Sequence, residues 1–578
     1  MEKERIGKEV QADVRMNSWM QFIVISLAAV IITVASSLMH IRLDLTGDHR
    51  YTLSKPTHKV LSELKNDIYI QVWLDGEMPV QFKKLRRSVK EMLDEFRVAS
   101  GRKVDYEFMN PSAGKDAKER NMQYESLSEK GLQPFNIQAK DEQGGASQKL
   151  IFPGMIVNYN GVEIPVNFLK NNESLSAEQR LLNSIEGLEY ELIQTIATIS
   201  SEKIKKIVFI EGHDELPQIE VDDIMMSLRK FFNIDMGPIN GRVGVLDRYS
   251  AVIVAAPKSS FNEKDKLALD QYIMNGGRVM WLLNEVAVNE DSLRFGETVA
   301  MYRPLNIEDQ LFKYGVRINP SVIQDMECIP IPMKVVTGKT QQQQLVPVPW
   351  IYYPLLYPSQ GNPVTRNINR VAGKYSNYID TVGLDPEIKK TVLLSTSKNT
   401  RLINPPALIS LKEADITPSE REFTRSSLPV AVMLSGKFQS LYKNRMTANL
   451  VEDKGFRLKE ESKYTRMIVI SDGEMIRNNV KRIGGKEQSL PLGQDRYTLQ
   501  TYGNKDFLVN CVNWLVDDNG LMQLRAREMK MRLLDRQAIR NNRVFIQSVN
   551  IMLPVILLAI AGLLYNLLRK RMYTRSGS

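Results

Sequence analysis

The chain has 578 residues, of which 43% are hydrophobic and 25% are charged. This composition supports packed cores and excludes a mainly disordered chain. At about 100–200 residues per domain, the length suggests three or four units. Much of the net charge of +10 lies beside two apolar segments, whereas a nucleic-acid binder would concentrate it in a patch with interleaved aromatic residues. Cys328 and Cys511 lie far apart in the sequence and offer neither a disulfide framework nor a metal-binding spacing.

The first apolar segment, residues 19–39, carries no charge and follows a short tail, residues 1–18. It is longer than the core of a signal peptide, which has about 7–15 residues. No convincing cleavage site follows it. We therefore expect an uncleaved membrane anchor, with a removed signal peptide as the alternative.

The second apolar segment, residues 544–568, is also uncharged and is followed at once by a basic tail, residues 569–578. About 20 apolar residues cross a bilayer core as a helix, so we expect a second membrane span. A soluble core helix is the alternative. Pro554 is tolerated inside a membrane helix, and Gln547, Asn550 and Asn566 are polar groups that prefer protein neighbours to lipid.

The stretch before this span is rich in Arg, and Leu, Met and Ile recur in it at three- and four-residue steps. This pattern predicts an amphipathic stalk helix over residues 519–543, continuous from Leu521 with the span. Two spans place both chain ends on one side of the membrane. Basic residues flank the second span on both sides, so the charge rule decides weakly. Because the first helix usually dominates, we expect both ends in the cytoplasm and the middle region outside it.

Residues 46–202 show the element order β-α-β-α-β-β-α. We expect a first helix from Ser54, strands at 68–74, 104–108, 149–159 and 162–168, and helices at 81–100, 119–130 and 176–201. Asn160-Gly161 predicts the turn of a hairpin. This order is that of a thioredoxin-like α/β domain, and the lack of a Cys-x-x-Cys motif excludes redox catalysis.

Residues 203–518 alternate apolar strands with helices. The strands are expected at 207–210, 251–256 and 278–283, and the helices at 221–232 and 262–275, which predicts a doubly wound, flavodoxin- or amidotransferase-like α/β domain. A proline-rich insertion covers residues 284–378, either a lid or a partner-binding arm. Further strands are expected at 391–396, 429–434 and 467–471, before a helix at 506–515.

Two loops follow predicted strands of this domain and are the candidate ligand or partner sites. In doubly wound sheets, ligands bind beyond the carboxyl ends of the strands. The first loop is Gly212, His213, Asp214 and Glu215, and the second begins with Asp472 and Gly473. His213 could bind a metal or act as a base, but adjacent polar residues in a loop more often form caps and turns.

Other chemical motifs are weak. Gly338-Lys339-Thr340 resembles the end of a phosphate-binding loop, but Met333 stands where the earlier glycine is required. Cys511 lies in an apolar helix and is expected to pack in a core. An amidotransferase would need a nucleophilic Cys at a strand-to-helix elbow, which is not found. We therefore expect no catalytic residue, no metal, no cofactor and no nucleic-acid partner.

Several stretches together resemble the GldG family, the gliding-motility-associated auxiliary or substrate-binding component of an ABC transporter. They are DLTGDHRYTLS, IVFIEGHDE, FNEKDKLALDQYIMNGGRVMWL, VAVMLSGKFQSLYKNR, MIVISDGEMIRNN and GNKDFLVNCVNWLVDDNGLMQLRAREMKMRLLD. The resemblance implies a GldF-like permease and a GldA-like ATPase as partners, a periplasmic large domain, and a fold related to one in intraflagellar transport proteins and some glycosidases. Family members often have Gly where this chain has Asp214.

The resemblance therefore implies a non-catalytic auxiliary subunit of an ABC transporter, with a substrate-binding or coupling role, anchored in a bacterial inner membrane. In this setting Gln547, Asn550, Pro554 and Asn566 are the candidate permease-facing residues of the second span. The main alternative is an extracytoplasmic receptor module that captures a solute or glycan near His213 and Asp472. A hydrolase is the third alternative.

Overall fold

The computed structural model describes residues 20, 22–24, 26–28, 30–31, 52–114, 116–140, 146–169, 176–201, 203–337, 342–383, 385–415, 418–445, 456–526 and 536–574. The chain forms two compact units, residues 1–527 and residues 528–578. The predicted regions 46–202 and 203–518 lie within the first unit. Their status as separate domains stays a prediction.

The N-terminal part of the first unit is built on a four-stranded sheet with the order β2-β1-β5-β6. β1 pairs in parallel with β2 and antiparallel with β5, and β6 pairs antiparallel with β5. Asn160 and Gly161 both have positive φ in the turn between β5 and β6, which confirms the hairpin prediction. The strands are β1 (Ile68–Val72), β2 (Val104–Phe108), β5 (Gly154–Tyr159) and β6 (Val162–Asn167).

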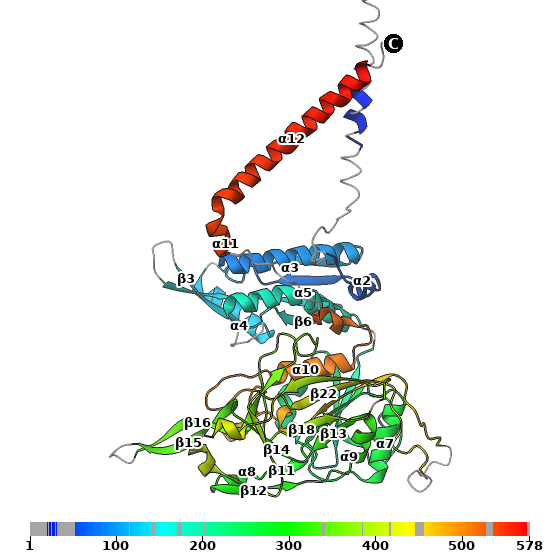
Figure 1. Cartoon of the computed structure of the whole chain (residues 1–578), viewed down its shortest axis with the longest axis vertical. Helices are drawn as coiled ribbons and strands as arrows, with labels where there is room; N and C mark the ends of the chain where they lie inside the picture. The colour runs from blue at the N-terminus through cyan, green and yellow to red at the C-terminus, as the bar shows by residue number, and fades with distance from the viewer. Residues whose placement is uncertain are drawn as a thin grey trace, which may run out of the picture. The chain divides into compact units, whose positions relative to one another are not determined.

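Four helices accompany this sheet: α2 (Lys55–Ser62), α3 (Val80–Ala99), α4 (Ala117–Glu129) and α5 (Ala177–Ile199). The predicted helix starts at Ser54 and at residue 176 are confirmed. Ser54 accepts a hydrogen bond from the Thr57 amide, and Ser176 accepts one from the Gln179 amide. α3 and α5 contact each other (Figure 1). Their apolar faces join one buried cluster that also holds side chains of β1 and β5.

One strand prediction in this region is wrong. The single strand expected over residues 149–159 is two strands, β4 (Ala146–Ile151) and β5, with Pro153 between them. Pro153 has no amide hydrogen for a ladder bond, and the Gly154 amide turns back to the Phe152 carbonyl at 2.8 Å. β4 pairs instead with β3 (Phe135–Lys140) in a separate hairpin. The assignment of a thioredoxin-like domain stays a prediction.

The larger part of the first unit is organised on a ten-stranded sheet. Its order is β15-β16-β19-β22-β23-β10-β9-β7-β8, and β17 pairs with β16. The strands β23, β10, β9, β7 and β8 are parallel, whereas β22, β19, β16 and β15 are joined by antiparallel pairing. The parallel strands are β7 (Lys206–Glu211), β8 (Asn233–Pro238), β9 (Ala251–Ala255), β10 (Val279–Leu282) and β23 (Thr465–Ile470).

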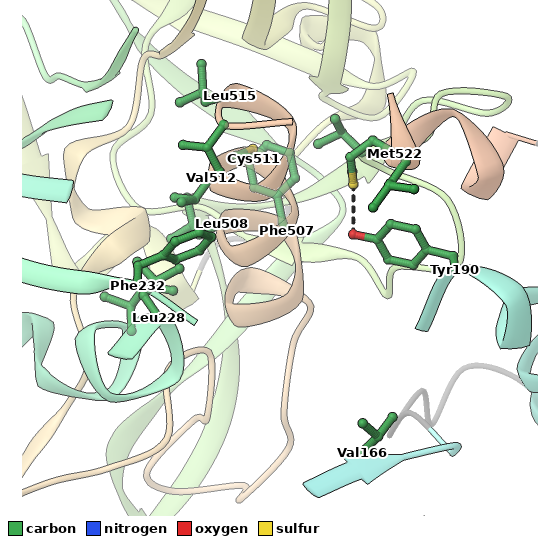
Figure 2. Packing of buried hydrophobic residues seen from close by; sticks show 14 of the residues in the cluster. Val166, Tyr190, Leu228, Phe232, Phe507, Leu508, Cys511, Val512, Leu515 and Met522 are labelled. Atoms are coloured by element: carbon green, nitrogen blue, oxygen red, sulfur yellow. Dashed lines mark hydrogen bonds between the residues drawn. The ribbon is translucent and has the colours of Figure 1, made fainter. Parts of the chain in front are cut away.

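Helices cover both faces of this sheet. α6 (Gln218–Arg229) and α10 (Asn504–Leu515) share the core cluster on one face, and α7 (Glu263–Met274) and α9 (Glu308–Tyr314) share the cluster on the other. Figure 2 shows Cys511 of α10 packed with its apolar neighbours, as predicted. The doubly wound prediction is confirmed for the parallel strands. β8 was not predicted, because its residues are only partly buried and lack an apolar pattern.

The expected insertion contains many short strands and one long hairpin. β15 (Cys328–Thr337) and β16 (Gln342–Pro358) pair antiparallel, with Pro330 opposite Pro349 and Pro332 opposite Pro347. Figure 1 shows this hairpin projecting from the body of the sheet. Met333 lies in β15, and the predicted Gly338-Lys339-Thr340 motif lies outside the described residues.

The remaining elements connect or cover this sheet. They are β11 (Val286–Ala287), α8 (Glu290–Leu293), β12 (Glu297–Tyr302), β13 (Val316–Asn319), β14 (Val322–Asp325), β17 (Val371–Ala372), β18 (Tyr378–Thr381), β19 (Lys389–Ser395), β20 (Thr400–Ile403), β21 (Ala407–Ser410), η1 (Leu411–Asp415), η2 (Glu420–Glu422), β22 (Pro429–Gly436), η3 (Gly473–Ile476), β24 (Val480–Ile483) and β25 (Lys486–Ser489).

The prediction of an unbroken helix from Leu521 into the span is wrong. Leu521 begins a 3₁₀ helix, η4 (Leu521–Ala526), which packs into the first unit. The Asp517 carboxylate accepts the Leu521 and Met522 amides at 2.9 Å, and both side chains are buried. Later, Asn542 is a turn between α11 (Arg536–Asn541) and α12 (Arg543–Thr574), and Asn side chains compete with helical backbone bonds. The stalk residues 527–535 lie outside the described residues.

In the second unit, α12 includes the predicted second span. Within Arg543–Leu568, a stretch of 18 residues reaches a mean hydropathy of 2.4, and the residues of the segment are exposed. Among the described residues, this is the one helix long and apolar enough to cross a membrane. The first predicted span, residues 19–39, lies mostly outside the described residues. The residues described there, between Met20 and Ile31, are helical, and all but one are exposed.

Candidate functional site

The predicted His213 loop lies at the point where the parallel sheet changes direction. α6 follows β7 on one face, whereas α7 follows β9 on the other, so the helices change faces between these neighbouring strands. The crevice beyond such a point is the usual ligand position in doubly wound folds. Gly212 has φ +115° and Asp214 has φ +56°, and this backbone turns His213 inward while Asp214 stays exposed.

His213 is held on every side by the protein. Its ring stacks on Phe261 with centroids 3.7 Å apart. Nδ1 lies 3.2 Å from the Glu215 carboxylate, and Nε2 lies 3.2 Å from Asp265 in ion-pair contact, without the angle of a hydrogen bond. The His213 carbonyl accepts the Lys258 and Ser259 amides at 2.8 and 3.0 Å. The side chain therefore joins the β7 loop to the start of α7.

The two carboxylates keep this imidazole charged. Burial opposes protonation, but Asp265 and Glu215 outweigh it and raise the pKa of His213 to about 9. Burial also acts against ionisation of Asp265, yet His213 and the Gly241 amide, which donates at 2.6 Å, lower the pKa of that carboxyl. His213 is only 3% exposed and its pKa lies above neutral, so it is placed as a structural joint between the β7 loop and α7.

Asp472 lies at the carboxyl end of β23 and is fully buried. Its Oδ2 accepts the Lys374 amide at 2.7 Å and the Ser376 hydroxyl. Within the described chain, its Oδ1 has no hydrogen-bond partner. Burial raises the pKa of Asp472 to about 7, which Ser376 and the Lys374 amide only partly oppose. This carboxyl therefore changes its protonation state near neutral pH.

Gly473 allows three segments to meet beside Asp472. Its amide donates to Asn284 Oδ1 at 2.5 Å. A Cβ atom at this position would lie 2.7 Å from the Ala256 Cβ and 2.8 Å from Asn284 Oδ1. The glycine in the predicted loop is thus required by close packing of the ends of β23, β10 and β9.

The structure does not bring His213 and Asp472 into one constellation. His213 turns towards Asp265 and Phe261, whereas Asp472 turns towards Lys374 and Ser376. No hydrogen bond or ion pair joins the two residues in the described chain. The two predicted loops thus occupy the same edge of the sheet with separate partners.

Sequence reasoning missed the polar residues that follow β10. The Asn284 side-chain amide donates from Nδ2 to the Tyr375 carbonyl at 3.1 Å, and the Glu285 backbone amide donates to Asn377 Oδ1 at 2.9 Å. Burial and then Glu308 raise the pKa of Glu285 to about 8. The available signal was the pair Asn284-Glu285 directly after a buried strand, at the same edge as the two predicted loops.

Charged residues surround this buried group. Arg477 pairs with Glu220 at 3.3 Å and with Glu474 at 2.9 Å, and Lys374 pairs with Glu290 at 2.6 Å. The cluster of Asn284, Glu285, Ser376 and Asp472, which we name the β10–β23 cluster, holds one side-chain amide, one hydroxyl and two carboxyls whose pKa values burial raises to about 8 for Glu285 and about 7 for Asp472.

Other chemistry has little structural support. Cys511 is fully buried, and burial raises the pKa of the Cys328 thiol to about 11. Reactive cysteines have low pKa values and partial exposure, so neither thiol is placed as a nucleophile. In the part of the chain that the structure describes, no group of His, Cys, Asp and Glu is arranged to hold a metal ion.

The predicted membrane residues all lie on α12. Gln547, Asn550, Pro554 and Asn566 are exposed, like their apolar neighbours. The three polar side chains form no hydrogen bond among the described residues. Ser548 differs, because its hydroxyl donates to the Val544 carbonyl of the same helix at 2.9 Å.

Two regions of the chain match known families. Residues 204–511 match the family described as an ABC-type uncharacterized transport system. Residues 47–158 match a domain of unknown function, DUF7088. The first match covers the parallel sheet, the β10–β23 cluster and most of α10, and the second covers the N-terminal region up to β5.

Similarity to individual proteins is more distant. An uncharacterized protein of Borreliella burgdorferi is 22% identical over 433 residues, which cover 72% of this chain and 76% of that protein. Among solved structures, the mmIFT52 N-terminal domain is 13% identical, and the match covers 54% of this chain and 98% of that domain with a TM-score of 0.31. This TM-score is too low to support an argument about the fold.

Proposed function

Because the chain belongs to the ABC-type uncharacterized transport system family, as the match over residues 204–511 shows, we propose that it is a membrane-anchored auxiliary subunit of an ABC transporter of the gliding-motility, GldG-like type. The family supports a transporter-associated, auxiliary role. In our proposal the subunit is non-catalytic and works with a GldF-like permease and a GldA-like ATPase. The resemblance of stretches such as IVFIEGHDE to GldG supports the gliding-motility type.

We take α12 as the membrane anchor of the proposed subunit. Its length and apolar surface, together with the family match, are the observations that most support membrane association. We further propose two passes, with residues 19–39 as the first span, both chain ends in the cytoplasm and the large domain in the periplasm. Reporter fusions at each chain end and after residue 285 test this topology. The two end fusions should report the cytoplasm and the internal fusion the periplasm, and any other pattern contradicts it.

In the proposed complex, one side of α12 contacts the permease. Gln547, Asn550 and Asn566 are exposed polar groups in an apolar helix, and interhelical hydrogen bonds satisfy such groups at about 1 kcal/mol each. Pro554 lies between them and frees a carbonyl that a neighbouring helix can satisfy.

Substitution of these polar groups tests the contact. Replacement of Gln547, Asn550 and Asn566 together by Leu should weaken co-purification of the permease in mild detergent. Ser548→Ala is the matched control, because the Ser548 hydroxyl is satisfied within its own helix. Equal recovery of the permease with the triple variant and with the wild type would contradict the proposed contact through Gln547, Asn550 and Asn566.

Affinity purification of the tagged full chain from native membranes tests the function itself. A polytopic permease and a separate ATPase should co-purify in fixed ratio after a high-salt wash. Recovery of the chain alone, after cross-linking in the intact cell membrane, would contradict an auxiliary transporter subunit.

A second candidate function is an extracytoplasmic receptor for a solute or a glycan. The observation that favours it is the buried Asp472 Oδ1, which lacks a protein partner among the described residues and belongs to a carboxyl whose pKa burial raises to about 7. A panel of sugars and neutral solutes should then raise the Tm of the full chain by mass action. The Gly473→Ala substitution displaces the loop, so a solute that stabilises the wild type should not stabilise this variant. Equal stabilisation of both proteins would contradict the receptor hypothesis.

A further inference from the structure

A small cavity lies where three separated stretches of the first unit meet. It has a volume of about 50 Å³, which is room for roughly three to five water molecules. α5 contributes Arg180 and Tyr190, the loop before β17 contributes Arg366, and η4 contributes Arg525. We name it the junction cavity. It is distinct from the His213 loop and from the β10–β23 cluster.

Arg525 is the most buried cation of this cavity, with 9% of its surface exposed. It donates to Asn510 Oδ1 and, at 2.9 Å, to the Arg366 carbonyl, and its guanidinium lies 5.3 Å from the centre of the Tyr190 ring. All three of these partners are uncharged. Among the described residues, no carboxylate lies within ion-pair distance of Arg525. A buried charge without a counter-ion is costly.

A second guanidinium in the cavity also lacks a carboxylate. Arg180 lies 5.9 Å from the Phe135 ring, and within the described chain it forms no ion pair. Arg366, by contrast, is neutralised by Glu186 at 3.0 Å. Glu191 also lines the cavity. The walls therefore hold one matched ion pair and two cations that no described carboxylate contacts directly.

We propose that the junction cavity binds an oxyanion, the phosphate or carboxylate group of a ligand, through Arg180 and Arg525. A guanidinium presents a planar fork of donors that fits such a group, and charge-assisted bonds of this kind are the strong ones. The amide of Asn183, which also lines the cavity, is a further donor for the same ligand. Phe168 and Tyr190 provide an apolar wall for the part of the ligand that carries no charge.

The bound oxyanion would join η4 to α5. These elements are already linked by the Tyr190 hydroxyl, which donates to the Met522 sulfur at 2.9 Å (Figure 2). η4 is the last described element before the chain continues into the second unit. Occupancy of the cavity therefore sets how firmly the end of the first unit is held.

Titration of the full chain with inorganic phosphate tests the site. The protein is placed in nanodiscs of phosphatidylcholine, and binding is followed by calorimetry and by hydrogen exchange. Phosphate should bind in a 1:1 ratio and slow exchange of residues 521–526 and 180–191. Arg180→Gln should weaken binding roughly tenfold, which is the loss of one charge-assisted bond. Arg525→Gln should do the same and keeps a side chain that can hydrogen-bond to Asn510.

Arg87→Gln is the matched control, because Arg87 is an exposed helical arginine of α3. It should bind phosphate like wild type. A second arm replaces phosphatidylcholine by phosphatidylglycerol without added phosphate. Protection of residues 521–526 that appears only in this arm, and that Arg180→Gln removes, identifies a lipid headgroup as the source of the oxyanion. Equal binding by wild type and Arg180→Gln, or no protection in either arm, would overturn the proposal.

Discussion

The His213 loop and the Asp472 loop follow parallel strands at the same edge of one sheet, yet they differ in whether neighbouring groups neutralise the buried charge. His213 is a buried cation enclosed by two carboxylates, Glu215 and Asp265. Asp472 is a buried carboxyl that no cation contacts and that keeps one oxygen without a described partner. The first loop is electrostatically complete, whereas the second changes charge with pH.

Two loops at one edge of the sheet therefore differ in their physical role: one stabilises the fold, and the other retains a polar atom that a ligand can contact. A completed ion network holds β7, β9 and α7 together and offers no group to a ligand. An incompletely satisfied carboxyl lowers stability when it ionises, but it can be compensated by a ligand donor. Loop position at a switch point therefore does not by itself identify a binding residue.

The largest effect should follow removal of the imidazole. His213→Ala leaves the Glu215 and Asp265 carboxylates close together without their cation, and loss of one partner of a buried ion pair costs about 3–5 kcal/mol. We expect this decrease in the free energy of unfolding at pH 7, measured by denaturant titration. His58→Ala is the control, because His58 is exposed on α2. A decrease below about 1 kcal/mol would show that the network is not a joint.

The opposite sign is expected for Asp472→Asn. The neutral amide keeps an acceptor for Lys374 and Ser376 and removes the cost of ionising a buried carboxyl. The pKa of Asp472 is raised from 3.8 to about 7 and one unit corresponds to about 1.4 kcal/mol, so we expect a gain of roughly 4 kcal/mol at pH 8 and little change at pH 4. Asp291→Asn, at an exposed position, should change neither value. Loss of stability at pH 8 would mean that the ionised form is compensated in the fold.

The pH dependence should divide into two windows. The folded-state pKa of Asp472, about 7, lies above its ordinary value of 3.8, so its stabilising neutral form is lost as the pH rises from about 4 through 7. The pKa of His213, about 9, lies above 6.5, so its contribution is complete below about pH 6.5 and is lost as the pH rises through 9. The difference in unfolding free energy between each variant and wild type should change only within its own window.

The smallest effect should come from the backbone of the His213 loop. Asp214 is exposed and has φ +56°, a region that glycine occupies without strain. Asp214→Gly should change the free energy of unfolding by no more than about 1 kcal/mol, and His213 should keep its high pKa by NMR titration. A large fall in that pKa would show that Asp214 helps to charge the imidazole.

The regular elements of the fold could be predicted where local signals agree. Ser54 and Ser176 cap helices, Asn160-Gly161 turns a hairpin, and the apolar runs at 207–210 and 251–256 lie in buried parallel strands. Polar edge strands such as β8 escaped prediction because they are only partly buried. The prediction of a continuous helix from Leu521 was wrong because the helical spacing of apolar residues also includes Leu521 and Met522. Tertiary contacts with Asp517 and Tyr190 hold these two residues in a short 3₁₀ helix instead.

The candidate site was only half predictable. Sequence position located both loops at the carboxyl edge, whereas the close approach of other segments to Gly473 was found only in the structure. Glu215 is a local partner of His213, but Asp265 and Ser376, the other partner of His213 and a partner of Asp472, lie about 50 and 100 positions away in the chain, and no local pattern connects them. Whether a buried polar group is paired depends on such distant contacts, which a single sequence does not display.

The prolines of the β15–β16 hairpin have a consequence for how this protein behaves at high local concentration. Pro330 faces Pro349, and Pro332 faces Pro347, across the ladder. Proline is tolerated there because opposed residues of non-hydrogen-bonded pairs point their amide positions outward. On β15, the outermost strand of the sheet, two outward amides are therefore missing, so a strand from another molecule that paired with this edge would lack two ladder hydrogen bonds. The arm can project from its sheet and still resist growth into a fibre.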